Sequence, residues 1–555
     1  MKRQKRVNDD ERELPQPIIQ HILSFLSMES AARLSMVSKT WYSSWATSPI
    51  LKLDNKESPL SIEEFRQEFL NYTNKSLQRY RNNVHNNNAD ALCVEQLQLS
   101  MRYFSVSSIS NSRFIKKLLD DIETAGVAIK ELHFNYTSYA FQSVKDALPE
   151  LSRILEVGFL TEFSVKGCRL EQKIGENQMI RCCLLRSLSL EYVYTNEDTL
   201  ESLISSCPLI ESMKFVCCPG LERIKAVNNS HNNSRLKNFS VIKCGKTSVV
   251  EVQAPNLESF YCFSVVPVIF KLYESCLNLK KLSLKSLSIE DSFFQDFAEN
   301  FPNLEDLSVV RCFSNKRINI SSNSLKSIEL RVDRVEVEIN APNMVSFEYV
   351  GQKIPCFQNL LDITTTTSTV CNYDIKILNL SFANGDVDRF MQLNKMFEIL
   401  LLHNKSKVSL LIDFKCNVLN TRSILKIIPI KIAREPGVEL ENDPTFHIYS
   451  FPSSPSFALY STLLDIVFLI CRPTSICLHS DKFSDSGFKK FFGRRLLMHS
   501  RRRSSANCSN SWENIRFWEE DLKEVKIVRA NDQEEAENEE QFFRLEKIFF
   551  RLKWY

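Results

Sequence analysis

Seventeen cysteines are the side chains of this 555-residue chain best suited to chemistry, because thiolates bind metals and act as nucleophiles. Two adjacent pairs stand out, Cys182 with Cys183 and Cys217 with Cys218. Neither pair has the C-x-x-C spacing of a zinc site, and none of the eight histidines lies near them at ligand spacing. The sequence therefore predicts no metal site and no cofactor.

Motifs that hold phosphate or expose a nucleophile are also missing. The chain contains no G-x-G-x-x-G, no G-x-x-x-x-G-K-[ST] and no G-x-S-x-G. Its 11 glycines are about 2 % of the residues, against roughly 7 % in an average protein. We therefore expect no catalytic residues and a protein that is not an enzyme.

Charge and hydropathy narrow the classes of partner. Seventy basic and 67 acidic residues leave a net charge of +3, which argues against a nucleic-acid or membrane-surface binder. The longest apolar run, Leu459 to Cys471, contains Asp465 and is too short to span a bilayer. Met1 to Arg6 leads into acidic residues without an apolar segment, so we expect no signal peptide, reduced cysteines, and residence in the nucleus, the cytoplasm or both.

The segment from Leu14 to Trp45 predicts three short helices. Pro15 and Pro17 suit the start of a helix because the N–H that proline lacks would be unpaired there. Apolar residues then recur at helical spacing, at Ile18, Ile22, Phe25, Leu26, Ala31, Leu34, Val37, Trp41 and Trp45. So small a unit buries little apolar surface alone, and such units often complete their core against a partner.

At these residues the sequence resembles the F-box, carried by Leu14-Pro15, the I-x-x-H-I-L-S-F-L run at Ile18 to Leu26, and V-S-K-x-W at Val37 to Trp41. Thr40 and Tyr42 depart from the basic residues usual in the family. The resemblance implies docking onto the Skp adaptor of cullin-RING, SCF-type ubiquitin ligases. The implied adaptor-binding residues are Leu14, Pro15, Ile18, Ile22, Leu23, Leu26, Val37 and Trp41. The alternative is a helical cap whose apolar residues, the tryptophans above all, form its own core.

A second pattern, Φ-x-x-Φ-x-Φ, repeats with a mean period of about 22.7 residues, inside the leucine-rich repeat range of 20 to 29. The clear copies begin at Leu185, Ile210, Leu236, Leu257, Leu279, Leu304, Leu325 and Met344, with looser copies at Val94, Ile129, Leu160 and Ile375. Cysteine follows eight positions after the first apolar residue in four copies, at Cys168, Cys218, Cys244 and Cys312. We expect these cysteines to point inward and serve the fold.

Stacked repeats of this kind form a parallel sheet whose concave face carries the x positions, where a ligand would lie. The candidate substrate-binding residues are Lys214, Tyr261, Phe263, Lys281, Lys285 and Arg331. The two aromatic residues are the most interesting, since aromatic side chains dominate interface hot spots. For any single one of the six, an ordinary solvated surface residue is the competing interpretation.

The predicted fold class is α/β, with a three-helix F-box, a leucine-rich repeat solenoid and an α+β C-terminal extension. The C-terminal W-x-x-x-L-K-x-V-K-I at Trp518 to Ile527 resembles plant F-box proteins with leucine-rich repeats, as does Glu63 to Tyr80. The predicted organisation is a tail at 1–11, the F-box at 12–52, a helical linker at 53–90, repeats at 91–350, a repeat-like α/β region at 351–530, and an acidic spacer with a terminal amphipathic helix at 531–555. That helix would place Phe542, Leu545, Phe549 and Leu552 on one face.

The resemblance implies a substrate receptor of an SCF-type ubiquitin ligase, which binds the Skp adaptor, through it the cullin-RING ligase, and an unknown protein target. A leucine-rich repeat scaffold that promotes no ubiquitin transfer is one alternative. A small-molecule-sensing receptor is another, and it would need a deep pocket on the concave face. The sequence does not distinguish them and does not name the target.

Overall fold

The structure is a computed structural model that divides into two compact units, unit 1 (Met1–Leu279) and unit 2 (Lys280–Tyr555). It describes residues 14–26, 28–48, 50–54, 93–102, 128–137, 160–167, 169–170, 183–227, 235–265, 268–272, 276–289, 291–312, 317–358, 371–380, 406–414, 445–449, 475–479, 522–528 and 547–554, with scattered helical residues in 64–82, 117–120, 389–396, 468 and 493–496. No helix among these residues is long and apolar enough to cross a membrane.

Unit 1 begins with the three predicted helices, α1 (Gln16–Ser24), α2 (Met28–Leu34) and α3 (Lys39–Ala46). Pro15 occupies the N-cap of α1, and the hydroxyl of Ser38 caps α3 by accepting a hydrogen bond from the N–H of Trp41 at 3.3 Å. Their core consists of Ile19, Leu23 and Ala31, with Leu26, Leu34, Trp41 and Trp45 packed against it. The three-helix prediction is confirmed.

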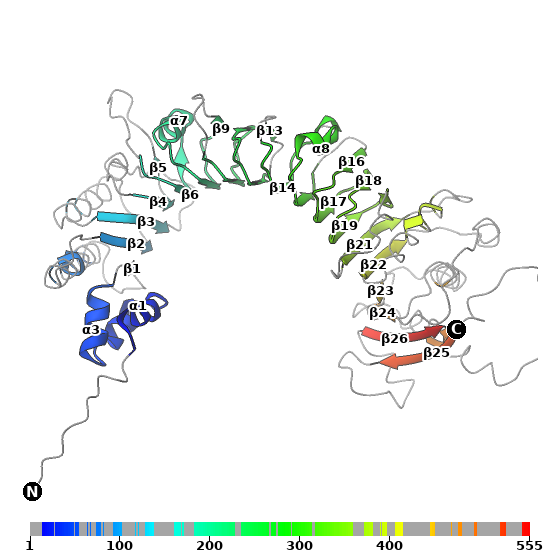
Figure 1. Cartoon of the computed structure of the whole chain (residues 1–555), viewed down its shortest axis with the longest axis horizontal. Helices are drawn as coiled ribbons and strands as arrows, with labels where there is room; N and C mark the ends of the chain where they lie inside the picture. Colours follow the sequence, from blue (N-terminus) through cyan, green and yellow to red (C-terminus); the bar gives the residue numbers. More distant parts are fainter. Residues whose placement is uncertain are drawn as a thin grey trace, which may run out of the picture. The chain divides into compact units, whose positions relative to one another are not determined.

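The rest of unit 1 is a ladder of parallel strands in which each strand pairs with the next along the chain (Figure 1). The strands are β1 (Ile50–Asp54), β2 (Cys93–Arg102), β3 (Ala128–Thr137), β4 (Glu162–Lys166), β6 (Ser187–Glu191), β8 (Ser212–Val216), β10 (Asn238–Ile242) and β12 (Ser259–Phe263). On the other side of the repeats lie helix α7 (Glu197–Ser205), the pair β5 (Arg169–Leu170) and β7 (Tyr194–Thr195), and a short ladder of β9 (Arg223–Val227), β11 (Val249–Gln253) and β13 (Ile269–Leu272).

Unit 2 repeats this plan and then departs from it. Its parallel ladder consists of β14 (Lys281–Lys285), β15 (Asp306–Val310), β17 (Ser327–Arg331), β19 (Ser346–Gly351), β21 (Cys371–Leu380), β22 (Ser406–Phe414), β23 (Thr445–Tyr449) and β24 (Ser475–His479). Two strands, β26 (Lys547–Trp554) and β25 (Leu522–Val528), add antiparallel pairing after β24. The outer elements are η2 (Asp291–Phe294), α8 (Phe297–Asn300), and the ladder β16 (Arg317–Ser321), β18 (Glu336–Asn340) and β20 (Cys356–Phe357).

The apolar residues of the repeat template form the core of both ladders. Within unit 1, Met213, Phe239 and Phe260 face one another in register on β8, β10 and β12, and each is at most 2 % exposed. The rings of Phe239 and Phe260 stack with centroids 6.1 Å apart. Burying a side chain of this size stabilises the fold by about 1.5–3 kcal/mol. The leucine-rich repeat prediction is thereby confirmed for the described strands.

In the turns after six of the ladder strands, the first residue is left-handed, and only one of the six is glycine. Positive φ angles occur at this position in Gly167, Tyr192, Cys217, Lys243, Ser286 and Arg311. The N–H of each donates to the last carbonyl of the next strand, as Tyr192 does to Val216 at 2.7 Å. The paired N–H offsets a backbone conformation that costs a non-glycine residue roughly 1–2 kcal/mol. The hydrogen bond at each of these turns thus helps a non-glycine residue to hold the left-handed conformation that glycine usually adopts. This agrees with the low glycine content of the chain.

The cysteines that follow these turns point inward. The thiols of Cys218 and Cys312 donate to the carbonyls of Leu190 and Leu284 in the preceding repeats, at 3.3 and 3.4 Å. Cys218, Cys244 and Cys312 are all buried. Their predicted structural role is confirmed, while Cys168 lies outside the described residues.

Two predictions about C-terminal segments are wrong. The repeat copy expected at Ile375 starts five residues too late, because Tyr373 and Ile375 pair with Phe347 and Tyr349 and occupy the buried positions. The expected terminal helix is strand β26 from Lys547 onward. Its burial alternates, with Phe550 and Leu552 inside and Arg551 and Lys553 outside, which is the period of a strand rather than of a helix. Residues 1–11, Phe542, Leu545 and the acidic run at 532–540 lie outside the described residues.

Candidate functional site

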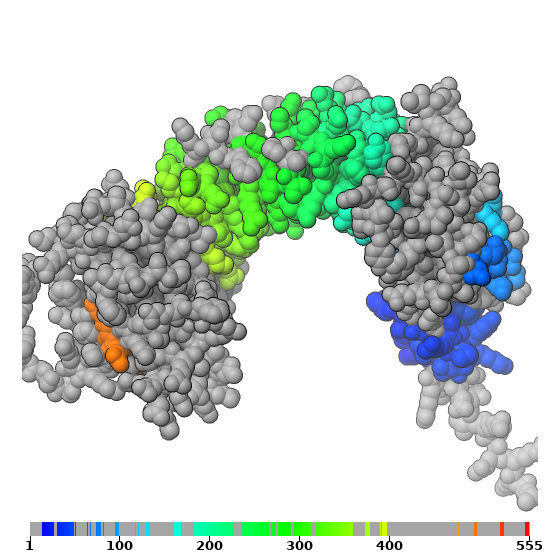
Figure 2. Space-filling view, turned by 180° about the vertical axis from the view of Figure 1, so that it is seen from behind, coloured from blue at the N-terminus to red at the C-terminus, as the bar shows by residue number. Residues whose placement is uncertain are grey.

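The first candidate site consists of exposed apolar side chains on the three N-terminal helices. Figure 2 shows this N-terminal segment in dark blue. We call this group of side chains the apolar F-box surface, and its members are Leu14, Ile18, Phe25, Met36, Val37 and Tyr42. They are six of the eleven exposed large hydrophobic residues in the described part of the chain. So many exposed apolar side chains within one small three-helix unit favour an interaction site there.

Helical geometry separates this surface from the core. Ile19 and Leu23 lie one turn apart on α1 and point inward, so Ile18 and Phe25 fall on other faces and stay exposed. Met36 and Val37 occupy the turn between α2 and α3, where their N–H groups donate to Arg33 and Leu34 at 3.2 and 3.1 Å. Val37 is 66 % exposed and Met36 81 %. The turn therefore presents two apolar side chains on a fixed backbone.

The side chain of Gln20 ties the first helix to the last. Its Nε2 donates to the carbonyl and the hydroxyl of Thr47, both at 3.3 Å. Gln16 Nε2 also donates to the Thr47 hydroxyl, at 3.0 Å. These polar contacts hold α1 against the end of α3, so the apolar F-box surface keeps one shape.

Burial sorts the predicted adaptor-binding residues into three groups. Leu14, Pro15, Ile18 and Val37 are exposed, and Ile22, Leu26 and Trp41 are half-buried. Leu23 is 5 % exposed and belongs to the core, so its prediction as a surface contact is corrected: the i, i+4 partner of Ile19 must face α3. Sequence reasoning missed Phe25, Met36 and Tyr42 as surface residues. The adjacent pair Met36 and Val37 just before the capping Ser38 was the available signal.

The second candidate site lies on the ladder of unit 1. We call the face whose side chains alternate with the buried ones the open face. Val216, Ile242 and Phe263 lie side by side in register on β8, β10 and β12, and each is half-buried. We call these three residues the apolar stripe. The sequence predicted Phe263 but not the two aliphatic residues that continue it.

Two more predicted residues lie on the row next to the stripe. Lys214 and Tyr261 both face Ser240 in the strand register, two strands apart. Lys214 is exposed, and the ammonium of Lys243 lies 5.3 Å from the centre of the Phe263 ring. The structure thus places Lys214 and Tyr261 beside the apolar stripe, to which Phe263 belongs.

Beside the stripe, residues of β4 and β6 are engaged with one another. Lys166 Nζ lies 2.6 Å from Glu191 and 5.5 Å from the centre of the Tyr192 ring. The charge of Cys217, its hydrogen bond to Tyr192, and burial raise the pKa of the Tyr192 phenol. Tyr192 therefore stays neutral at physiological pH. The charges of Lys166 and Glu191 cancel, so these strands add no net charge beside the apolar stripe.

The remaining predicted residues belong to unit 2. Lys281 pairs with Asp306 at 3.3 Å, and Arg331 lies between Glu329 at 3.0 Å and Glu348 at 2.6 Å. Lys285 lies at the end of β14 on the same face. Lys281 and Arg331 therefore balance neighbouring carboxylates within unit 2.

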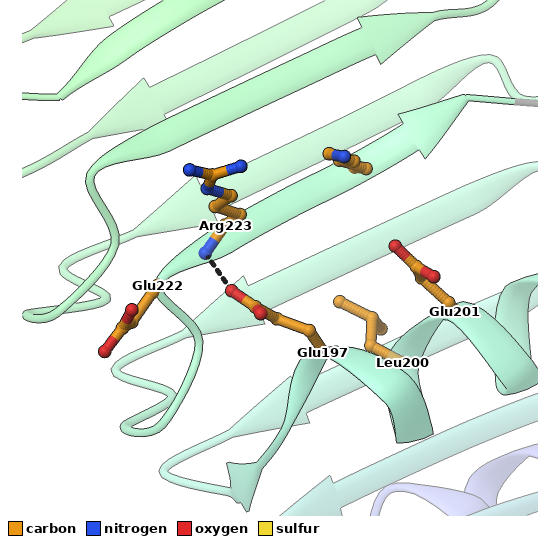
Figure 3. A pocket seen from close by; sticks show the side chains of 6 residues that line it. Glu197, Leu200, Glu201, Glu222 and Arg223 are labelled. Carbon is orange, nitrogen blue, oxygen red and sulfur yellow. Dashed lines mark hydrogen bonds between the residues drawn. The ribbon is translucent and has the colours of Figure 1, made fainter.

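A polar depression lies on the opposite side of the unit 1 repeats, between α7 and β9 (Figure 3). Its volume is about 330 Å³, and it is lined by Glu197, Leu200, Glu201, Glu222, Arg223 and Lys225. Glu197 accepts a hydrogen bond from the N–H of Arg223 at 2.7 Å. The carboxylate thus protects the free edge of β9, which is a structural role.

Two family models match parts of this chain. The F-box domain model matches residues 12–53, and the model for the leucine-rich repeats of the FBD-associated F-box protein At5g56370 matches residues 122–271. An F-box in general indicates binding to an Skp-type adaptor. An F-box followed by stacked repeats defines the class of F-box substrate adaptors, whose members are in general not catalytic. The chain is a plant-type F-box protein with leucine-rich repeats.

The similar proteins come from Arabidopsis thaliana. F-box/LRR-repeat protein At2g42720 is 22 % identical over 63 % of this chain and 70 % of its own length. F-box/LRR-repeat protein At1g55660 is 25 % identical over 59 % and 81 %, and FBD-associated F-box protein At5g22730 is 24 % identical over 36 % and 38 %. The chain spans 36 to 52 % of the length of three further relatives of the FBD type.

Proposed function

We propose that this chain is the substrate-recognition subunit of an SCF-type E3 ubiquitin ligase, resident in the nucleus or cytoplasm. The apolar F-box surface binds an Skp-type adaptor, and the repeats bind a target protein. The observation that carries the proposal is the concentration of six large exposed hydrophobic residues between positions 14 and 42. Water contact with this much apolar surface is unfavourable, and a partner that covers it removes the cost.

Such a subunit needs no catalytic residue of its own. By holding a target on the same assembly as a ubiquitin-charged conjugating enzyme, it raises the effective concentration of target lysines near the thioester. This tethering role requires two separate binding surfaces, and the proposal assigns the adaptor to the helices and the target to the strands. The chemistry takes place on other subunits.

Reconstitution tests this function. The full chain is mixed with recombinant Skp-type adaptor, cullin and RING protein and passed over a size-exclusion column. The proposal predicts that chain, adaptor and cullin co-elute, and that the double variant Met36→Glu with Val37→Glu elutes apart from them. The proposal is contradicted if the wild-type chain and the double variant both co-elute with adaptor and cullin. It is also contradicted if neither of them does.

Val265→Glu is the matched control, because Val265 is also 66 % exposed but lies after β12, outside the helices. It makes the same valine-to-glutamate change as one half of the double variant, at an equally exposed valine, and we expect it to leave co-elution unchanged. A second measurement separates the receptor from the non-degradative scaffold. The purified assembly is incubated with ubiquitin and with activating and conjugating enzymes, and the absence of polyubiquitin on it would indicate the scaffold.

A further inference from the structure

The apolar stripe, Lys214 and Tyr261 together form a surface on which no described segment of the chain lies. Resting on the proposed function, we infer that this part of the open face binds an extended target segment that combines apolar and acidic side chains. Target recognition would then take place on β8, β10 and β12, through apolar contacts and through ion pairs with lysine.

The apolar part of the argument is the register of three strands. Val216, Ile242 and Phe263 share one row, so their side chains form a continuous strip about 10 Å wide, given roughly 4.8 Å between neighbouring strands. Tyr261 lies on the same strand as Phe263 and borders the strip. Tyrosine is among the residues enriched in interface hot spots, so Tyr261 is the strongest single anchor that this surface offers.

The charge of the surface selects the occupant. The nine open-face positions of β8, β10 and β12 are Ser212, Lys214, Val216, Asn238, Ser240, Ile242, Ser259, Tyr261 and Phe263. They include a lysine and no carboxylate. Lys243 adds a second ammonium at the end of the stripe, and neither lysine has an ion-pair partner among the described residues. Carboxylates on a partner would complement both.

The open face of unit 2 makes the contrast. There β15, β17 and β19 carry Asp306, Glu329 and Glu348, each paired with Lys281 or Arg331. Lys281 and Arg331 on that face are balanced by carboxylates of the same chain, whereas Lys214 and Lys243 have no such carboxylate among the described residues. The unbalanced positive charge therefore coincides with the apolar stripe.

The spacing also sets the length of the segment. Three strands span about 10 Å, which an extended chain covers in about three residues at roughly 3.3 Å each. An acidic side chain over Lys214 then lies one row from apolar side chains over the stripe. A core motif of three to four residues that holds at least one Asp or Glu beside a large hydrophobic residue fits this surface.

Selection from a random 12-residue peptide library displayed on phage, with the full chain immobilised, tests the inference. The expected result is enrichment of peptides that hold Asp or Glu within two residues of a large hydrophobic side chain. A selected peptide should bind Lys214→Glu at least about tenfold more weakly, because like charges then meet at the interface. Lys246→Glu is the control: Lys246 is also exposed but lies in the turn between β10 and β11, so we expect less than about a twofold change.

Several outcomes would overturn the inference: no enrichment, enriched peptides without acidic residues, or equal binding to Lys214→Glu and the wild type. Binding of a single-stranded RNA 20-mer that competes with the selected peptides and is lost in Lys214→Glu would assign the surface to nucleic acid instead. Adaptor co-elution of Lys214→Glu separates the two proposals, because it should remain intact. A chain that binds acidic peptides but not the adaptor would contradict the proposed function and leave this inference standing.

Discussion

The backbone N–H of Cys218 donates a hydrogen bond to Sγ of Cys244 in the next repeat at 3.4 Å. Cys218 in turn donates its own thiol hydrogen to the carbonyl of Leu190 in the preceding repeat. The hydrogen bond to Cys244 and burial raise the pKa of the Cys218 thiol, so it stays protonated and can donate. Three successive repeats are thus linked through buried sulfur atoms.

Replacing Cys244 with alanine removes the acceptor for the Cys218 N–H. We expect the apparent free energy of unfolding to fall by about 1–3 kcal/mol, the cost of a buried donor left without a partner. Urea unfolding followed by circular dichroism measures the change. Cys183→Ala, at an exposed cysteine, should change stability by less than about 0.5 kcal/mol, and equal losses in the two variants would refute the structural role.

Cys312 predicts a pH dependence of stability. Burial raises its pKa to about 11, above the ordinary value near 9 that it has when unfolded. A raised pKa means that the folded state holds the proton more tightly, so this stabilisation is complete below pH 9 and is lost as the pH rises toward 11. The difference in unfolding free energy between the wild type and Cys312→Ala should shrink across that window. A difference that stays constant from pH 8 to pH 11 would contradict the assignment.

Two glycines should respond oppositely to the same change. Gly220 has φ of +99°, and an added Cβ would lie 2.5 Å from the carbonyl oxygen of Thr195. Gly245 has no atom within 4 Å of that position. We expect Gly220→Ala to destabilise by more than about 1 kcal/mol, and Gly245→Ala to be neutral or stabilising by up to about 1 kcal/mol. Thermal unfolding of the two variants side by side checks this, and a stable Gly220→Ala would show that the turn can relax.

The repeat pattern could be predicted from the sequence because burial alone determines it. Leu188, Met213 and Phe239 follow a spacing that only a stacked strand requires, and their strands appear where the spacing puts them. The prediction from this pattern was wrong where the template can be placed at two different starting residues. Ile375 belongs to two possible copies of the template, and the pairing of Tyr373 with Phe347 decides between them only in three dimensions.

The terminal segment shows the same ambiguity. Phe549 and Leu552 fit a helical stripe, while Phe550 and Leu552 fit an alternating strand, and a neighbour such as β24 favours the strand. For the candidate sites, the sequence indicated the region but not the exposed side. It could not separate Leu23 from Phe25, because both are apolar and only helix packing turns one inward. It did not reveal the apolar stripe, which exists only because Val216, Ile242 and Phe263 share a strand register.

The affinity of the full chain for a purified Skp-type adaptor, measured by isothermal titration calorimetry, tests the central claim most directly. The account predicts that Val37→Glu weakens binding by at least about tenfold, since each 1.4 kcal/mol lost at the interface is a factor of ten. Val265→Glu, which carries the same change at an equally exposed valine, should bind within about twofold of the wild type. Equal affinities for the two variants, or no measurable binding by the wild type, would contradict the account.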